Sequence, residues 1–147
     1  MKMLLQRVTQ ASVAVDTEEV SRIGPGLLVF LGLEQTDDSE VASGLLHRLL
    51  RLRIFPDDAG RMNRSVVDSS GDILLVSQFT LAADTSRGRR PGFSAALPPA
   101  AAEPLYDFCL DYLASQHPQA RVCGGVFGAN MQIGLVNDGP ATFLLSA

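Results

Sequence analysis

Hydrophobic and polar positions alternate along the first part of the chain as they do in β-strands. Valine and alanine side chains within residues 8–15 are interleaved with polar ones at a period of about two, which predicts a half-buried strand. A Gly-Pro-Gly turn at residues 24–26 precedes the continuous apolar run 27–31, which is typical of a strand buried on both faces. We expect three strands before the first helix.

Two later segments carry the spacing of amphipathic helices. Within residues 41–52, valine and leucine recur near helical spacing, and Asp37 with Glu40 three residues later resembles a capping box. A second helix is predicted from Pro99, because proline is tolerated in a first turn, and apolar side chains follow from Leu105 at positions i, i+3, i+4, i+7 and i+8. A His-Pro pair ends this pattern.

The rest of the pattern predicts strands and turns. The predicted strands cover residues 73–81, 122–127, 131–136 and 141–145. Residues 137–140, Asn-Asp-Gly-Pro, are predicted as a hairpin turn, and residues 55–60 and 83–99 as loops. This order predicts one α/β domain over residues 1–147, with a mixed, barrel-like sheet partly covered by two main helices.

Composition narrows the function classes. The 147 residues are 46% hydrophobic and 19% charged, enough apolar material for a core and too much for a disordered chain. No apolar run reaches the length of a membrane span, the N-terminus does not resemble a signal peptide, and two cysteines make no disulfide framework, so we expect a cytoplasmic protein that binds no membrane. A net charge of −4 excludes a broad surface that coats nucleic acid, so any contact with nucleic acid should be local, on a small footprint.

Familiar catalytic motifs are missing. The sequence has no P-loop and no G-x-S-x-G elbow, and its two cysteines and two histidines make a poor metal site. Cys109 falls on the apolar stripe of the second predicted helix, where a buried structural role is expected. We expect neither a metal nor another cofactor.

Two polar segments stand out instead. Residues 77–81 read Ser-Gln-Phe-Thr-Leu, and residues 137–142 read Asn-Asp-Gly-Pro-Ala-Thr. Each alone fits ordinary strand alternation or a turn, but together they resemble the two motifs of the D-aminoacyl-tRNA deacylase family of bacteria and eukaryotes. The resemblance covers essentially the whole chain, including Gly-Arg-Arg-Pro at residues 88–91 and Val-Phe-Gly-Ala-Asn-Met at residues 126–131.

The resemblance implies an editing enzyme. Such an enzyme hydrolyses the ester between a D-amino acid, or a mischarged glycine, and the 3′ acceptor end of tRNA, and it spares L-aminoacyl-tRNA. It implies a homodimer in which Gly139-Pro140, joined by a cis peptide bond, enters the partner's site. Main-chain carbonyl groups there would take the substrate's amino group and fill the space that an L side chain needs.

The resemblance also assigns roles to particular residues. The catalytic segment would be Ser77, Gln78, Phe79 and Thr80. The substrate-binding residues would be Gly139, Pro140, Asn137, Thr142, Phe127 and Met131. The nucleophile stays open between the Thr80 hydroxyl and water assisted by the substrate's own 2′-hydroxyl.

Other readings stay open at this point. One is a catalytically silent module that binds the 3′ end of tRNA on the same scaffold, and another is a conventional serine or cysteine ester hydrolase. Arg87, Arg89 and Arg90 either form a solvated loop or contact phosphates of the acceptor end.

Overall fold

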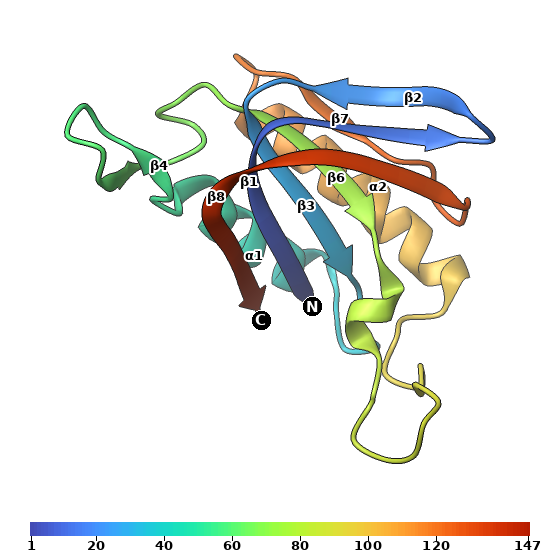
Figure 1. The fold of residues 1–147 in the computed structure, drawn as a ribbon. Helices are drawn as coiled ribbons and strands as arrows, with labels where there is room; N and C mark the ends of the chain where they lie inside the picture. The colour runs from blue at the N-terminus through green and yellow to red at the C-terminus, as the bar shows by residue number, and fades with distance from the viewer.

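The fold is organised by one long strand, β1 (Lys2–Val15), which pairs with three other strands in the computed structural model of residues 1–147 (Figure 1). The other elements are β2 (Glu18–Ile23), β3 (Gly26–Gly32), α1 (Ser39–Arg51), β4 (Phe55–Pro56), β5 (Met62–Arg64), β6 (Asp72–Ser77), the 3-10 turn η1 (Phe79–Ala82), α2 (Pro99–Gln116), β7 (Val122–Gly124) and β8 (Met131–Ser146). β1 pairs antiparallel with β3 through its first half, with β2 through its second half, and with β8 through both halves.

The sheet is mixed and curls toward a barrel. Its strand order is β2-β1-β3-β6-β7, with β8 on β1, and β3, β6 and β7 run parallel. β2 and β7 stand at opposite ends of this order and still contact each other, so the sheet is nearly closed. Both helices lie on the same side of it (Figure 1). The predicted α/β fold class is confirmed. No helix has the length and apolar character that crossing a membrane requires.

Two apolar clusters fill the two faces of the sheet. The larger one, of 22 buried residues, lies between the sheet and the helices and contains Leu27, Val29 and Cys109. The smaller one, of 7 buried residues, fills the other face and contains Leu28 and Val76. Alternate residues of the run 27–31 therefore enter different clusters, which confirms the prediction of a strand buried on both faces.

The first helix begins one residue later than its apparent capping box predicts. Asp38 is the N-cap, and its carboxylate accepts hydrogen bonds from the backbone N–H groups of Glu40 and Val41. Asp37 accepts instead from the Met1 ammonium, at 2.6 Å, and from the backbone N–H of Glu34, at 2.6 Å. The charged ammonium is a stronger hydrogen-bond donor to a carboxylate than the neutral N–H groups of the helix end. The sequence around Asp37 does not show that the Met1 ammonium lies beside it.

Three predicted boundaries are wrong in ways that matter for the site. The strand predicted over 73–81 ends at Ser77, after which the chain turns into η1. Residues 137–140 do not reverse the chain, because the segments on both sides of them pair with the same strand β1, and they form an irregularity within β8. The loop predicted over 55–60 is the start of a short hairpin, in which β4 pairs with β5.

Tyr106 ties helix α2 to the sheet. Its side chain is 2% exposed, and its hydroxyl donates a hydrogen bond of 2.8 Å to the backbone carbonyl of Leu75 in β6. Burial raises the pKa of the Tyr106 phenol to about 12, so it stays protonated and donates at any physiological pH.

Replacing Tyr106 with phenylalanine leaves the Leu75 carbonyl without this partner. We expect the free energy of unfolding to fall by about 1–2 kcal/mol near neutral pH. Because the native pKa lies above the unfolded value, the contribution is complete below about pH 10 and is lost as the pH rises toward 12. Urea unfolding of both proteins across this range measures the difference, and a difference that grows above pH 10 would contradict this assignment.

Candidate active site

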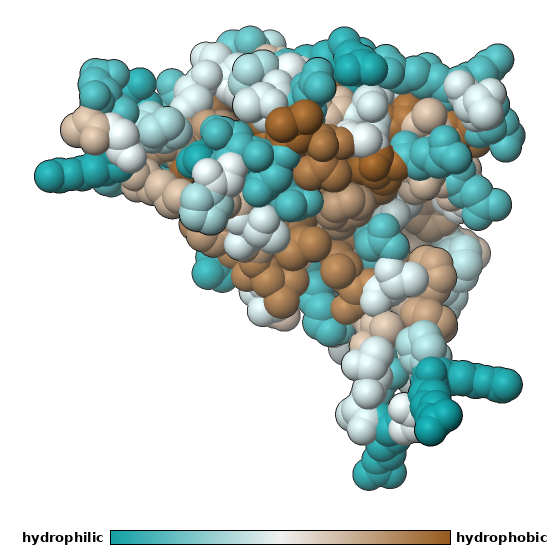
Figure 2. Space-filling model, in the orientation of Figure 1, coloured by the Kyte–Doolittle hydropathy of each residue, from teal (hydrophilic) through white to brown (hydrophobic).

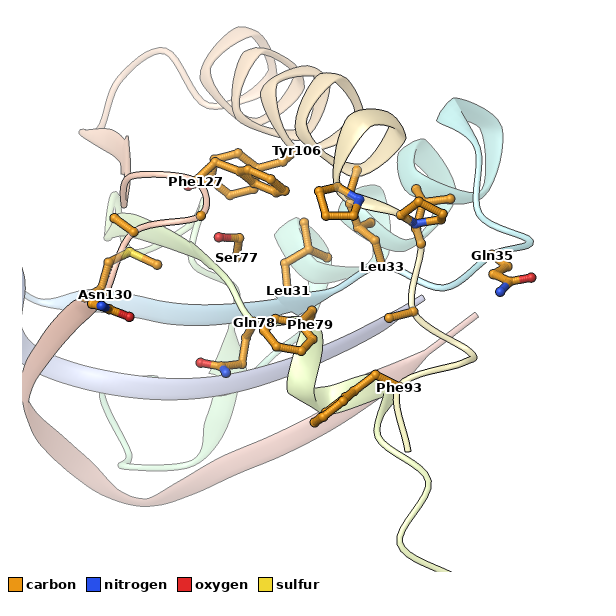
Figure 3. Close-up of a pocket in the computed structure, with 18 of the residues that line it drawn as sticks. Leu31, Leu33, Gln35, Ser77, Gln78, Phe79, Phe93, Tyr106, Phe127 and Asn130 are labelled. Carbon is orange, nitrogen blue, oxygen red and sulfur yellow. The ribbon is translucent and has the colours of Figure 1, made fainter. Parts of the chain in front are cut away.

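A pocket of about 800 Å³ opens where the parallel strands β3 and β6 end. In sheets with parallel strands, the carboxyl ends of the strands are the usual place for a ligand. The pocket lies between these strand ends, the start of α2 and the segment 127–131 (Figure 3). Of its 20 lining residues 12 are hydrophobic, and none of the 20 is Asp, Glu, His, Lys, Arg or Cys.

The Ser-Gln-Phe segment enters this pocket because β6 ends there. Ser77 is paired with Leu31, the backbone N–H of Gln78 donates to the Leu31 carbonyl at 2.7 Å, and η1 follows at once. The chain approaches β3 so closely that a Cβ on Gly32 would lie 2.8 Å from the Leu81 Cβ. Sequence reasoning did not single out Gly32, because its neighbour is 49 positions away in the chain.

The four residues predicted to be catalytic do not all face the pocket. Ser77, Gln78 and Phe79 line it, but Thr80 does not. The Thr80 hydroxyl accepts a hydrogen bond of 2.5 Å from the Gln78 side-chain amide, and an amide cannot remove its proton. The role of these residues stays a prediction, and nothing beside Thr80 activates it as a nucleophile.

Aromatic side chains form the floor and the rim of the pocket. Phe127 packs against Tyr106 at the floor, with ring centroids 5.9 Å apart. Phe79 and Phe93 meet edge to face at the rim, with centroids 5.0 Å apart (Figure 3). Phe127 and Met131, predicted to bind substrate, both line the pocket, which thus offers flat apolar surfaces of the kind on which a nucleobase stacks.

The second motif lies outside the pocket of its own chain. Asn137, Gly139, Pro140 and Thr142 are exposed and are absent from the pocket lining. The peptide bond between Gly139 and Pro140 is cis, as the resemblance implies. The Thr142 hydroxyl accepts a hydrogen bond from the side-chain amide of Gln6 in β1, at 3.3 Å. One chain therefore does not bring its own two motifs together.

Partly buried polar contacts hold this second segment in place. The Asn137 side-chain amide donates to the backbone carbonyls of Arg7, at 3.0 Å, and Ala141, at 3.3 Å. Arg7, only 8% exposed, donates from Nε to the Asp138 carbonyl and carboxylate at 3.1 and 2.9 Å, and from Nη1 to the Ile54 carbonyl. Sequence reasoning missed Arg7, because only its position in an apolar strand marks it as unusual.

Other reactive side chains are placed away from the pocket. His117 is buried at the end of α2, where its ring Nε2 contacts the Gly71 carbonyl, and His47 lies on the exposed face of α1. Burial raises the pKa of the Cys109 thiol to about 12 and also raises that of Cys123. Both thiols therefore stay protonated near neutral pH, and no group of three or more His, Cys, Asp or Glu side chains is arranged to hold a metal ion.

Comparison with known proteins places the chain in a family. Residues 4–146 match the family model described as D-Tyr-tRNA(Tyr) deacylase. The chain is 55% identical over 147 residues to a D-aminoacyl-tRNA deacylase of Azotobacter vinelandii and 56% identical over 147 residues to one of Stutzerimonas stutzeri, with 100% of each chain covered.

Two solved structures share the fold of this chain. A protein described as c-Myc DNA Unwinding Element Binding Protein superposes with a TM-score of 0.95 at 39% identity, over 100% of this chain and 99% of that one. A probable eukaryotic D-amino acid tRNA deacylase superposes with a TM-score of 0.85 at 20% identity, over 98% of this chain and 97% of that one, which shows the shared fold. The chain belongs to the D-aminoacyl-tRNA deacylase family and is a hydrolase of that family.

Proposed function

We propose that this protein hydrolyses the ester between a D-amino acid or glycine and the terminal ribose of tRNA, and that it spares L-aminoacyl-tRNA. The observation that carries the proposal is the pocket itself, which has apolar and aromatic walls, polar Ser77 and Gln78, and no ionisable side chain other than the Tyr106 phenol. Such a pocket suits a neutral nucleoside with an activated ester, and it supplies no acid or base of its own near pH 7.

The chemistry is then assisted by the substrate. Water attacks the ester carbonyl carbon, the bond to the ribose 3′ oxygen breaks, and that oxygen takes up a proton. The neighbouring 2′-hydroxyl passes the proton, since no side chain in the pocket is placed to do so. The backbone N–H of Gln78 is bonded to the Leu31 carbonyl, so the backbone N–H of Phe79 is the donor that stabilises the oxyanion, an effect typically worth about 2.7–4 kcal/mol.

Selection against L substrates requires a group that fills the space of an L side chain. D and L substrates contain the same atoms, so a difference of about 1.4 kcal/mol in steric fit is needed for each tenfold in selectivity. We assign this part to Gly139 and Pro140 of a second copy of the chain. Glycine as substrate has no side chain to reject and is therefore accepted.

Exposed apolar side chains along β8 support a homodimer. Leu135, Val136 and Leu144 are 37%, 48% and 63% exposed, and they lie on both sides of the exposed Gly139–Pro140 pair. Figure 2 shows apolar surface in this region. Exposed apolar groups that cluster on one strand are typical of a protein interface. In the homodimer that we propose, β8 packs against the partner and Gly139 of one protomer enters the partner's pocket.

The other two functions have less support. A conventional serine or cysteine hydrolase needs a base beside its nucleophile, and the pocket holds no histidine or carboxylate. A silent module that binds the 3′ end of tRNA would use the same pocket, so turnover is what separates it from the proposed enzyme.

Turnover on matched substrates tests the proposed function. We expect release of D-tyrosine from D-Tyr-tRNA and of glycine from Gly-tRNA well above the spontaneous rate, and no acceleration for L-Tyr-tRNA. Thr80→Ala should retain turnover within about threefold, because Thr80 does not line the pocket and no base lies beside its hydroxyl, whereas loss of a true nucleophile costs several orders of magnitude. Tight tRNA binding without turnover would instead favour the silent module.

The shared site is tested by mixing two inactive variants. In Gly139→Ala the new Cβ would lie 2.5 Å from the Asn137 side-chain oxygen, so the segment must shift, and we expect activity to be lost. Ala129→Trp should also be inactive, because Ala129 lines the pocket and the indole ring would fill the space of the nucleoside. When the two are unfolded and refolded together, about a quarter of wild-type activity should return, because half of the dimers are mixed and each has one intact site. No recovery in a mixture shown to contain mixed dimers would contradict the shared site.

A further inference from the structure

We propose that the loop of residues 84–92, here called the arginine loop, binds backbone phosphates of the tRNA acceptor strand while the 3′ end occupies the pocket; this inference rests on the proposed function. The loop carries Arg87, Arg89 and Arg90 within four positions. In Figure 1 it projects from the body after η1, and in Figure 2 its tip is strongly hydrophilic.

The three arginines are exposed and have no partner within the chain. None of them forms a side-chain hydrogen bond or an ion pair, whereas Arg7, Arg22 and Arg64 each contact a carboxylate. The one acidic side chain of the loop, Asp84, accepts a hydrogen bond from the backbone N–H of Ser86. Hydrogen bonding to Ser86 lowers the pKa of Asp84, so this carboxylate stays ionised at the base of the loop.

The charge of the loop contrasts with that of the whole chain. The protein carries a formal net charge of −4, so three unpaired guanidinium groups on one loop form a local positive region on an acidic molecule. Guanidinium groups bind phosphate oxygens in a bidentate manner, and like charges this close together repel one another until an anion neutralises them.

The base of the loop is fixed at the rim of the pocket. Asp84 and Gly92 exchange two backbone hydrogen bonds of 2.8 and 2.9 Å, which close the loop. The next residue, Phe93, packs on Phe79 at the rim, and the carbonyl of Ser94 accepts a hydrogen bond from the Gln35 side chain. The base of the arginine loop is thus fixed at the pocket mouth, and the arginine side chains beyond it remain free.

The size of the loop fits a few nucleotides. A hairpin that extends by three or four residues reaches about 10 Å beyond its base. A stacked strand advances about 3.4 Å for each nucleotide, so this reach spans about three phosphates next to the terminal nucleoside. Because the terminal nucleoside would lie in the pocket, the phosphates on its 5′ side are the nearest anions that the loop can meet.

Substrates with and without phosphates separate this role from catalysis. The variant Arg87→Gln/Arg89→Gln/Arg90→Gln should have a kcat/KM on D-Tyr-tRNA at least about tenfold lower than that of the wild type. Its slope of log(kcat/KM) against log salt should be less steep by about 2 units, because each phosphate contact contributes about 0.7 to the slope. It should hydrolyse the 3′ ester of D-tyrosine with adenosine, which has no phosphate, at the wild-type rate.

Two further variants control for charge. Arg48→Gln/Arg53→Gln/Arg61→Gln makes the same change in net charge at three exposed positions outside the pocket and should match the wild type on both substrates. Arg87→Lys/Arg89→Lys/Arg90→Lys keeps the charge and should keep the salt slope. Equal losses on both substrates, an equal loss in the control variant, or no loss on tRNA would each overturn the proposal.

Binding of uncharged tRNA provides an independent measurement. Fluorescence anisotropy should give a Kd at least about tenfold weaker for the glutamine variant of the arginine loop than for the wild type. If the wild type hydrolyses neither ester, the proposed function fails while this measurement still decides the role of the loop. An unchanged Kd would overturn the proposal and leave an acidic protein as the partner to be sought.

Discussion

The end of strand β6 is the structural constraint on which the site depends. β6 is buried on both faces and parallel to β3, so its last residue, Ser77, is placed at the carboxyl end of the sheet. There the backbone N–H of Gln78 bonds to the Leu31 carbonyl, and the chain turns into η1 rather than extending the strand. The absence of a side chain on Gly32 permits this close approach. Main chain thus reaches an apolar pocket in a fixed geometry.

A pocket built in this way limits the chemistry available to the protein. Its walls come from strand ends, the first turns of α2 and the segment 127–131, and none of these contributes a group that titrates near neutral pH. The Tyr106 phenol donates its hydrogen bond to the Leu75 carbonyl, and the Thr80 hydroxyl accepts a hydrogen bond from the Gln78 side chain. In the mechanism that we propose, catalysis relies on main-chain dipoles and on the substrate, which is consistent with a pocket that holds no catalytic triad.

Local sequence predicts a helix or strand well where the hydrophobic pattern of its own consecutive residues determines the structure. The run 27–31 and the helix from Pro99 are examples, because burial on both faces and helical periodicity are properties of consecutive residues. Local sequence does not predict the structure where contacts with distant segments of the chain determine it. The Asp-Gly-Pro sequence before residue 141 has the composition of a hairpin turn, yet pairing with β1 on both sides keeps β8 continuous. The polar residues at the end of β6, Ser77 and Gln78, also fit the alternation of a strand that continues, so they do not mark where it ends. The roles of Arg7 and Gly32 depend on neighbours far along the chain.

In the mechanism that we propose, the substrate's 2′-hydroxyl passes the proton that a catalytic side chain would otherwise transfer. This role is tested most directly by D-Tyr-tRNA that carries the ester on the 3′ oxygen of a terminal 2′-deoxyadenosine. This substrate should bind with nearly unchanged Kd and be hydrolysed at least about 100-fold more slowly than the ribose form, after the spontaneous rates are subtracted. Hydrolysis of the deoxy substrate at nearly the ribose rate would contradict the account and require a nucleophile or base from the protein.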